Sequence, residues 1–143
     1  MKRIYVLLLT LGVLLLVGCT KDYKAIAYTK FVKTFENDSN YILDNQSLKY
    51  ENQYERFLDA TGEKTKYYFY EFKTKEEARD YMISNYKDRD GFKFKDKNKY
   101  IEVIKNDEIY FQIIQVDNII VSGTANSSKD KKEVLNIFKK LGY

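Results

Sequence analysis

Apolar and polar positions follow two different periods along the chain, and these periods predict a mixture of helices and strands. An almost uninterrupted apolar run occupies residues 4–17. From Tyr28 to Phe35, apolar residues at i, i+3, i+4 and i+7 fall on one helical face. The aromatic run Tyr67–Phe72 instead suits the pleated surface of a strand.

Turn residues divide the rest of the chain into further strands. The segment Asp44–Tyr54 suits either a helix or a loop. We favour a loop followed by a strand at residues 55–60, because Thr61-Gly62-Glu63 supplies a hairpin turn directly after that strand. The expected strands cover residues 41–43, 55–60, 67–72, 92–94, 100–105, 108–116 and 119–123.

Two further helices have recognisable ends. Thr74 and Glu77 have the spacing of a capping box, which predicts a helix that continues to about residue 90. We expect Ser127 or Ser128 to cap the last helix, and Gly142 to end it.

These elements predict an α+β domain with an antiparallel meander sheet and helices packed on one of its faces. The order can be divided into two αβββ units plus a C-terminal helix. At an offset of 51 residues, Phe31 and Phe35 correspond to Met82 and Tyr86. The loops that follow differ in length, and residues 67–72 then correspond to 110–115. These similarities fit either a duplication or two like units of separate origin.

The N-terminal apolar run is too short to span a bilayer. Fourteen helical residues reach about 21 Å, whereas the hydrocarbon core is about 30 Å thick. Lys2 and Arg3 precede the run and small residues end it, so the pattern indicates a signal peptide over residues 1–18.

The sequence Leu16-Val17-Gly18-Cys19 resembles the lipobox of bacterial lipoproteins. This resemblance implies cleavage before Cys19, acylation of its sulfur, and a lipid-anchored position on the extracytoplasmic face of the cell membrane. Residues 19–23 would form a short tether and residues 24–143 a single domain. Cys19 is the only cysteine, so the alternative is a retained hydrophobic anchor with an idle thiol.

The basic residues that follow Cys19 would lie close to the membrane. They are Lys21, Lys24, Lys30 and Lys33. Each can contribute about 1 kcal/mol near an anionic leaflet. The alternative is the solvated face of an ordinary helix.

Composition excludes several kinds of chemistry. The chain has no histidine, tryptophan or proline, but it has 14 tyrosines and 9 phenylalanines. Histidine-dependent triads and His/Cys zinc sites are therefore absent from the sequence. The Asp88–Gly91 segment lacks the spacing of a calcium loop. We expect no cofactor, metal site or catalytic residue, although Glu71, inside the aromatic strand, is the acid that most merits inspection; otherwise it is an outward-facing residue paired with a lysine.

Charge argues against nucleic-acid binding. The net charge is +4, and removal of Lys2 and Arg3 with the signal lowers it to +2. One segment could still contact anionic wall polymers or lipid headgroups, because lysines alternate along it: Lys93, Lys95, Lys97 and Lys99. The alternative is a strand whose lysines prevent edge-to-edge aggregation.

These observations favour a non-enzymatic interaction module at the cell envelope, with an exported protein or an anionic wall polymer as its partner. The C-terminal segments Val116-Asp117-Asn118 and Leu141-Gly142-Tyr143 are similar to small uncharacterised lipoproteins of Gram-positive bacteria. The helix-plus-three-strand outline resembles peptidase-propeptide (PepSY) domains, which implies a protease inhibitor or chaperone-like module as the alternative. A hydrolase that uses carboxylates is the third hypothesis.

The lipid anchor gives the first prediction. The chain extracted from membranes should lack residues 1–18 and carry a lipid-sized mass increment, because Cys19 is the only thiol available for acylation. The Cys19→Ala variant should remain uncleaved or be released. Intact-mass spectrometry measures both, and a wild-type chain without the increment would contradict the anchor.

Overall fold

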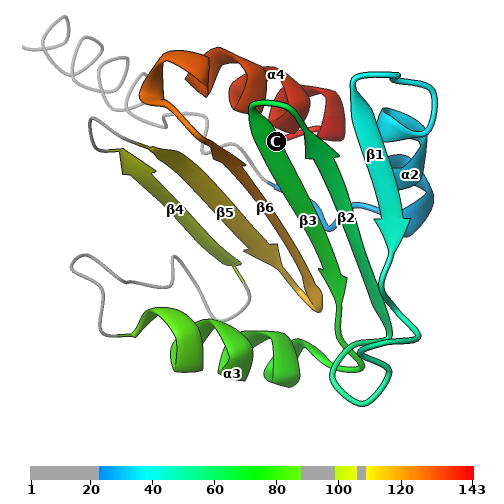
Figure 1. Cartoon of the computed structure of the whole chain (residues 1–143). Helices are drawn as coiled ribbons and strands as arrows, with labels where there is room; N and C mark the ends of the chain where they lie inside the picture. Colours follow the sequence, from blue (N-terminus) through cyan, green and yellow to red (C-terminus); the bar gives the residue numbers. More distant parts are fainter. Residues whose placement is uncertain (1–22, 88–98, 106–108) are drawn as a thin grey trace, which may run out of the picture.

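The computed structural model describes residues 23–87, 99–105 and 109–143; for 99–105 and Ser128 it describes the backbone alone. Three helices and six strands occupy these residues (Figure 1). They are α2 (Tyr28–Phe35), β1 (Tyr41–Asn45), β2 (Arg56–Gly62), β3 (Thr65–Glu71), α3 (Lys75–Tyr86), β4 (Lys99–Lys105), β5 (Tyr110–Val116), β6 (Ile119–Ala125), the 3-10 turn η1 (Ser128–Asp130) and α4 (Lys131–Leu141).

The strands form one antiparallel sheet in the order β1-β2-β3-β6-β5-β4. This arrangement confirms the α+β class, the antiparallel sheet and the C-terminal helix. Two meanders, β1-β2-β3 and β4-β5-β6, are joined through the pairing of their last strands, so the sheet is not one continuous meander. Tyr67 lies opposite Gly123 in this central pair, and Phe69 lies opposite Val121.

Helices α2 and α4 cover one face of the sheet, as expected. Phe31 and Phe35 of α2 pack on Tyr67 and Phe69, with ring centroids 5.2–5.5 Å apart between the elements. The apolar side of α4 completes this core with Val134, Ile137, Phe138 and Leu141, all buried.

Helix α3 departs from the expectation that the helices share one face. Its Ala78 and Met82 belong to a second core cluster with Ile113 and Ile120. These two strand residues alternate with Ile114 and Val121 of the first core and therefore face the other way. The sheet thus has an apolar surface on both sides, and α3 covers part of the second one (Figure 1).

Among the described elements, the order contains two αβββ units, but the expected correspondence between them does not match the sheet. The sequence similarity pairs residues of β3 with residues of β5, whereas β3 occupies the position equivalent to β6. The first helices of the two units also lie on opposite faces. A two-fold axis that exchanges the antiparallel neighbours β3 and β6 runs perpendicular to the sheet, so it would leave both helices on the same face. Because α2 and α3 lie on opposite faces, no such axis relates the two units.

The helix ends follow the expected chemistry with small changes. The Thr74 side chain accepts the Glu77 N–H at 3.1 Å, and the Glu77 carboxylate accepts the Lys73 N–H at 3.1 Å. Ser127 caps the 3-10 turn and not the α-helix, because its Oγ accepts the Lys129 N–H. Gly142 ends α4 with φ of 101°.

Helix α3 ends at Tyr86, earlier than the expected end near residue 90. The expected strand at 92–94 and the segment Asp88–Gly91 lie outside the described residues. The segment from residue 46 to residue 55 is a loop with two turns, as the hairpin argument favoured.

The absence of a side chain at Gly123 is required by the first core. A Cβ built there would lie 2.8 Å from the Phe138 ring and 2.9 Å from the Tyr67 ring. We predict that Gly123→Ala lowers the free energy of unfolding by about 1–3 kcal/mol because both rings must shift. Urea unfolding measures this, with Leu135→Ala on the exposed side of α4 as the control. Equal stability of the two variants would contradict the packing argument.

Candidate functional site

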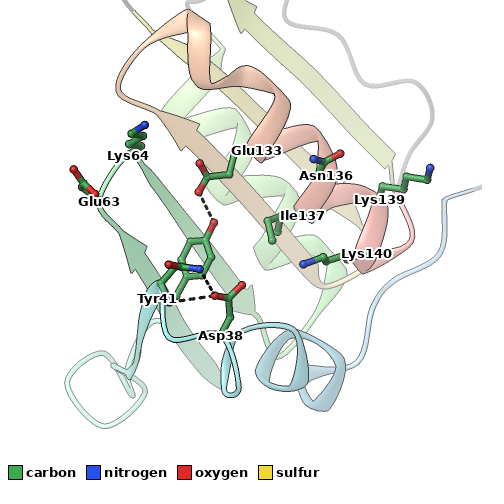
Figure 2. A pocket seen from close by; sticks show the side chains of 10 residues that line it. Asp38, Tyr41, Glu63, Lys64, Glu133, Asn136, Ile137, Lys139 and Lys140 are labelled. Atoms are coloured by element: carbon green, nitrogen blue, oxygen red, sulfur yellow. Dashed lines mark hydrogen bonds between the residues drawn. The ribbon is translucent and has the colours of Figure 1, made fainter.

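A cavity of about 840 Å³ lies between α4, the turn from α2 to β1, and the β2–β3 hairpin (Figure 2). We refer to it as the α4 cavity. Its lining carries both signs of charge: Asp38, Asn40, Tyr41, Glu63, Lys64, Glu133, Asn136, Ile137, Lys139 and Lys140.

Glu133 is the centre of the hydrogen-bond network in the α4 cavity. It accepts hydrogen bonds from the Tyr41 hydroxyl at 2.5 Å and from the Thr65 hydroxyl at 2.7 Å, both on Oε1. Figure 2 shows the Tyr41 ring directed at this carboxylate. Burial and the hydrogen bond to Glu133 raise the pKa of Tyr41 above its ordinary value. The network therefore ties β1 and β3 to α4.

The Tyr67 hydroxyl is buried beneath this network. It has no hydrogen-bond partner within the distance and angle limits for a good bond, and burial raises the pKa of Tyr67 strongly. Thr65 and Tyr41 lie near enough to influence the pKa of Tyr67, with Thr65 acting against the effect of burial. The group belongs to the interior of the fold and not to the cavity surface.

Other polar groups of the α4 cavity also bond to protein atoms. Asp38 accepts the backbone N–H and the side-chain amide of Asn40, at 3.1 and 2.8 Å. Lys64 lies 4.0 Å from Asp130. The cavity holds three carboxylates, but Asp38 and Glu133 act as hydrogen-bond acceptors for the fold. This chemistry suits a structural junction better than a reaction centre.

The second candidate is an aromatic surface on the sheet face opposite α2 and α4. Phe57 and Tyr70, on neighbouring strands, stack with centroids 4.7 Å apart and planes inclined by 15°. Tyr68 stacks beside Tyr70 at 6.0 Å. All three side chains are half-buried, and we call this row the aromatic surface.

The aromatic surface continues into a hollow beside α3. The ring of Tyr54 lies 5.2 Å from that of Tyr70 and 6.1 Å from that of Tyr81. Burial and the neighbouring Tyr81 raise the pKa of Tyr54 to about 12. Tyr54 and Tyr81 line a hollow of about 380 Å³ with the following residues: Asn52, Gln53, Phe72, Lys73, Glu77 and Asp80.

Towards the outer edge, the aromatic surface meets an exposed apolar residue. Ile42 of the edge strand β1 lies opposite Thr61, and its side chain is 76 % exposed. Lys66 and Asp59 form an ion pair of 3.5 Å on the same face, and the Lys66 amine lies 5.0 Å from the centre of the Tyr68 ring. The surface thus combines aromatic, apolar and charged groups, and α3 reaches it at Tyr70, whose ring lies 5.7 Å from that of Tyr81.

The residues singled out from the sequence have different outcomes. Cys19 lies outside the described residues, as do Lys93, Lys95 and Lys97. Lys99 begins β4, of which only the backbone is described. Glu71 pairs with Arg56 at 3.0 Å across β2 and β3, so it has an arginine partner and not the lysine expected.

Sequence reasoning did not identify either candidate site. Glu133 lies 92 positions from Tyr41, and nothing in the local pattern links them. The alternation in β2 and β3 could have indicated the aromatic surface, because Phe57 and Tyr68 fall out of phase with Leu58 and Phe69. No group of three or more His, Cys, Asp or Glu side chains suited to a metal ion occurs within residues 23–87 and 109–143.

Comparison with known proteins adds no assignment: no family model, curated protein or solved structure matches this chain. Among the described residues, no helix has the length and apolar character needed to cross a membrane.

The network around Glu133 gives a stability prediction. Glu133→Ala should lower the free energy of unfolding by about 1–3 kcal/mol, because the buried Thr65 hydroxyl loses its acceptor. Glu133→Gln retains an acceptor and should cost less. Glu63→Ala, an exposed glutamate of the same cavity, is the control in urea unfolding. If Glu133→Ala is as stable as this control, the network does not stabilise the fold.

Proposed function

We propose that this protein is a lipid-anchored, non-enzymatic interaction module of the cell envelope, and that it binds another exported protein through the aromatic surface. The anchor is the acylated Cys19 implied by the lipobox-like sequence. The single observation that carries the binding proposal is the row of Phe57, Tyr68 and Tyr70, half-buried on neighbouring strands.

The chemistry of this row suits a protein contact. Tyrosine and phenylalanine present a large area at small entropic cost, and they are enriched where interfaces bury their centre. A charged pair, Lys66 with Asp59, flanks the rings, as polar groups flank the centre of many interfaces. The hollow beside α3 is the size of a side-chain pocket, so a partner residue can be inserted next to the rings.

The position of β1 favours a protein over a wall polymer. It is an edge strand, and exposed apolar Ile42 stands on the same face as the aromatic surface. An edge strand offers backbone donors and acceptors to a partner chain, which a glycan or a teichoic-type polymer would use less fully. The partner is therefore expected to place a loop or strand along β1 and side chains over the rings.

Site-specific photocrosslinking in cells tests the contact. A photoreactive phenylalanine analogue at position 42 should form an adduct with an exported protein, whereas the same analogue at position 135 should not. Both native side chains are exposed, so neither replacement disturbs the core. Tyr68→Ser should reduce the adduct from position 42 at least about tenfold, in the range of an interface hot spot.

Tyr28→Ser is the matched control, because Tyr28 is a half-buried tyrosine on the opposite side of the sheet. Circular dichroism establishes that each variant is folded. Equal loss of adduct in the two tyrosine variants would contradict the proposed surface. Adducts with wall glycan alone would contradict a protein partner.

A further inference from the structure

Lysine side chains are concentrated on the two helices of one face, and the residues that flank these helices include the acids Glu36, Asp38 and Asp130. α2 and α4 together contain six lysines and one acidic residue, Glu133, which accepts two hydroxyls. The whole chain has a net charge of only +4, and α3 on the other face has three acidic and two basic residues. Five of the lysines on α2 and α4 are exposed: Lys30, Lys33, Lys132, Lys139 and Lys140. We call this the basic face.

The described chain enters the domain on the same side. Tyr23 packs against the first core, with its ring 5.7 Å from that of Tyr143. Tyr143 follows Gly142, the residue that caps the C-terminal end of α4. Lys30 lies here as well, because its amine is 3.0 Å from the position that a Cβ would take at Gly142. The start of the described chain, the C-terminal end of α4 and Lys30 therefore lie close together at one corner of the domain.

The distance from Tyr23 to Cys19 is short. Four residue steps of about 3.5 Å span at most about 14 Å. Surface potentials of anionic membranes decay over a Debye length of about 8 Å at physiological ionic strength. An acyl group on Cys19 would thus hold this corner within reach of the headgroups.

We propose that the basic face lies against the anionic lipid surface and fixes the orientation of the domain on the membrane. This inference rests on the lipid anchor of the proposed function, but it concerns a different face. Leu135 supports it, because this exposed apolar residue stands three positions after Lys132 and four before Lys139, an arrangement suited to the headgroup region. The aromatic surface, on the opposite face of the sheet, then points away from the membrane.

Fluorescence quenching on vesicles tests the orientation with the full-length lipidated chain. A fluorophore is attached at Leu135→Cys or at Ile42→Cys, and the quencher is a headgroup-labelled lipid. On mixed phosphatidylglycerol–phosphatidylcholine vesicles, the label at position 135 should be quenched at least about twofold more than on phosphatidylcholine alone. The label at position 42 should be quenched weakly on both.

Charge variants identify the lysines responsible. Each lysine near an anionic surface contributes about a fivefold gain in binding. Replacement of Lys33, Lys132 and Lys139 by glutamine should therefore abolish the extra quenching at position 135, and raised salt should do the same. The matched control replaces three exposed lysines elsewhere by glutamine: Lys49, Lys73 and Lys75.

The outcomes distinguish the orientation from the anchor. Equal quenching at positions 135 and 42, equal quenching on neutral and anionic vesicles, or an equal effect of the two triple variants would overturn the basic face. Retention on neutral vesicles reports the lipid anchor alone. A chain that is absent from neutral vesicles but binds anionic ones with quenching confined to position 135 contradicts the anchor and supports the face.

Discussion

The antiparallel pairing of β3 with β6 is the constraint on which the rest of the structure depends. Seven residue pairs join these strands, and no other strand pairing connects the β1-β2-β3 and β4-β5-β6 halves of the described sheet. The pairing is non-local, since α3, β4 and β5 intervene, and such contacts form at a high cost in chain entropy. It places Tyr67 opposite Gly123, and the missing side chain there leaves room for the rings that support α2 and α4. If the pair separated, both cores would be divided.

Each face of this sheet uses tyrosine differently. On the face that α2 and α4 cover, Tyr67 packs fully buried in the core, and Tyr41 donates its hydroxyl to Glu133 and so links β1 to α4. On the opposite face, Tyr68 and Tyr70 are half-buried and stack on one another. A chain without tryptophan can thus build both a core and a contact surface from the same residue, because a phenol packs its ring and still bonds through its hydroxyl.

The sequence predicted the parts of the fold that local patterns determine. The helix at Tyr28–Phe35, the capping box at Thr74 and the hairpin at Asp117-Asn118 depend on residues close together in the chain, and the structure confirms them. The side of the sheet chosen by α3 could not be predicted in this way. Ala78 and Met82 give the helix an apolar stripe, but the stripe fits either face of a sheet that is apolar on both. The network around Glu133 was missed for the same reason, since Glu133 meets Tyr41 only through the tertiary fold.

A strand that divides its side chains between two faces also separates two roles within a few residues. In β3, Phe69 supports α2, while its neighbours Tyr68 and Tyr70 form the aromatic surface. A change at Tyr68 can therefore alter a contact on one side while the packing behind it stays in place. The lysines of α2 and α4 are on the far side of the same sheet, about 10 Å or more away across packed layers. The proposed membrane orientation and the proposed partner contact can then vary independently, because no described residue of the basic face belongs to the aromatic surface.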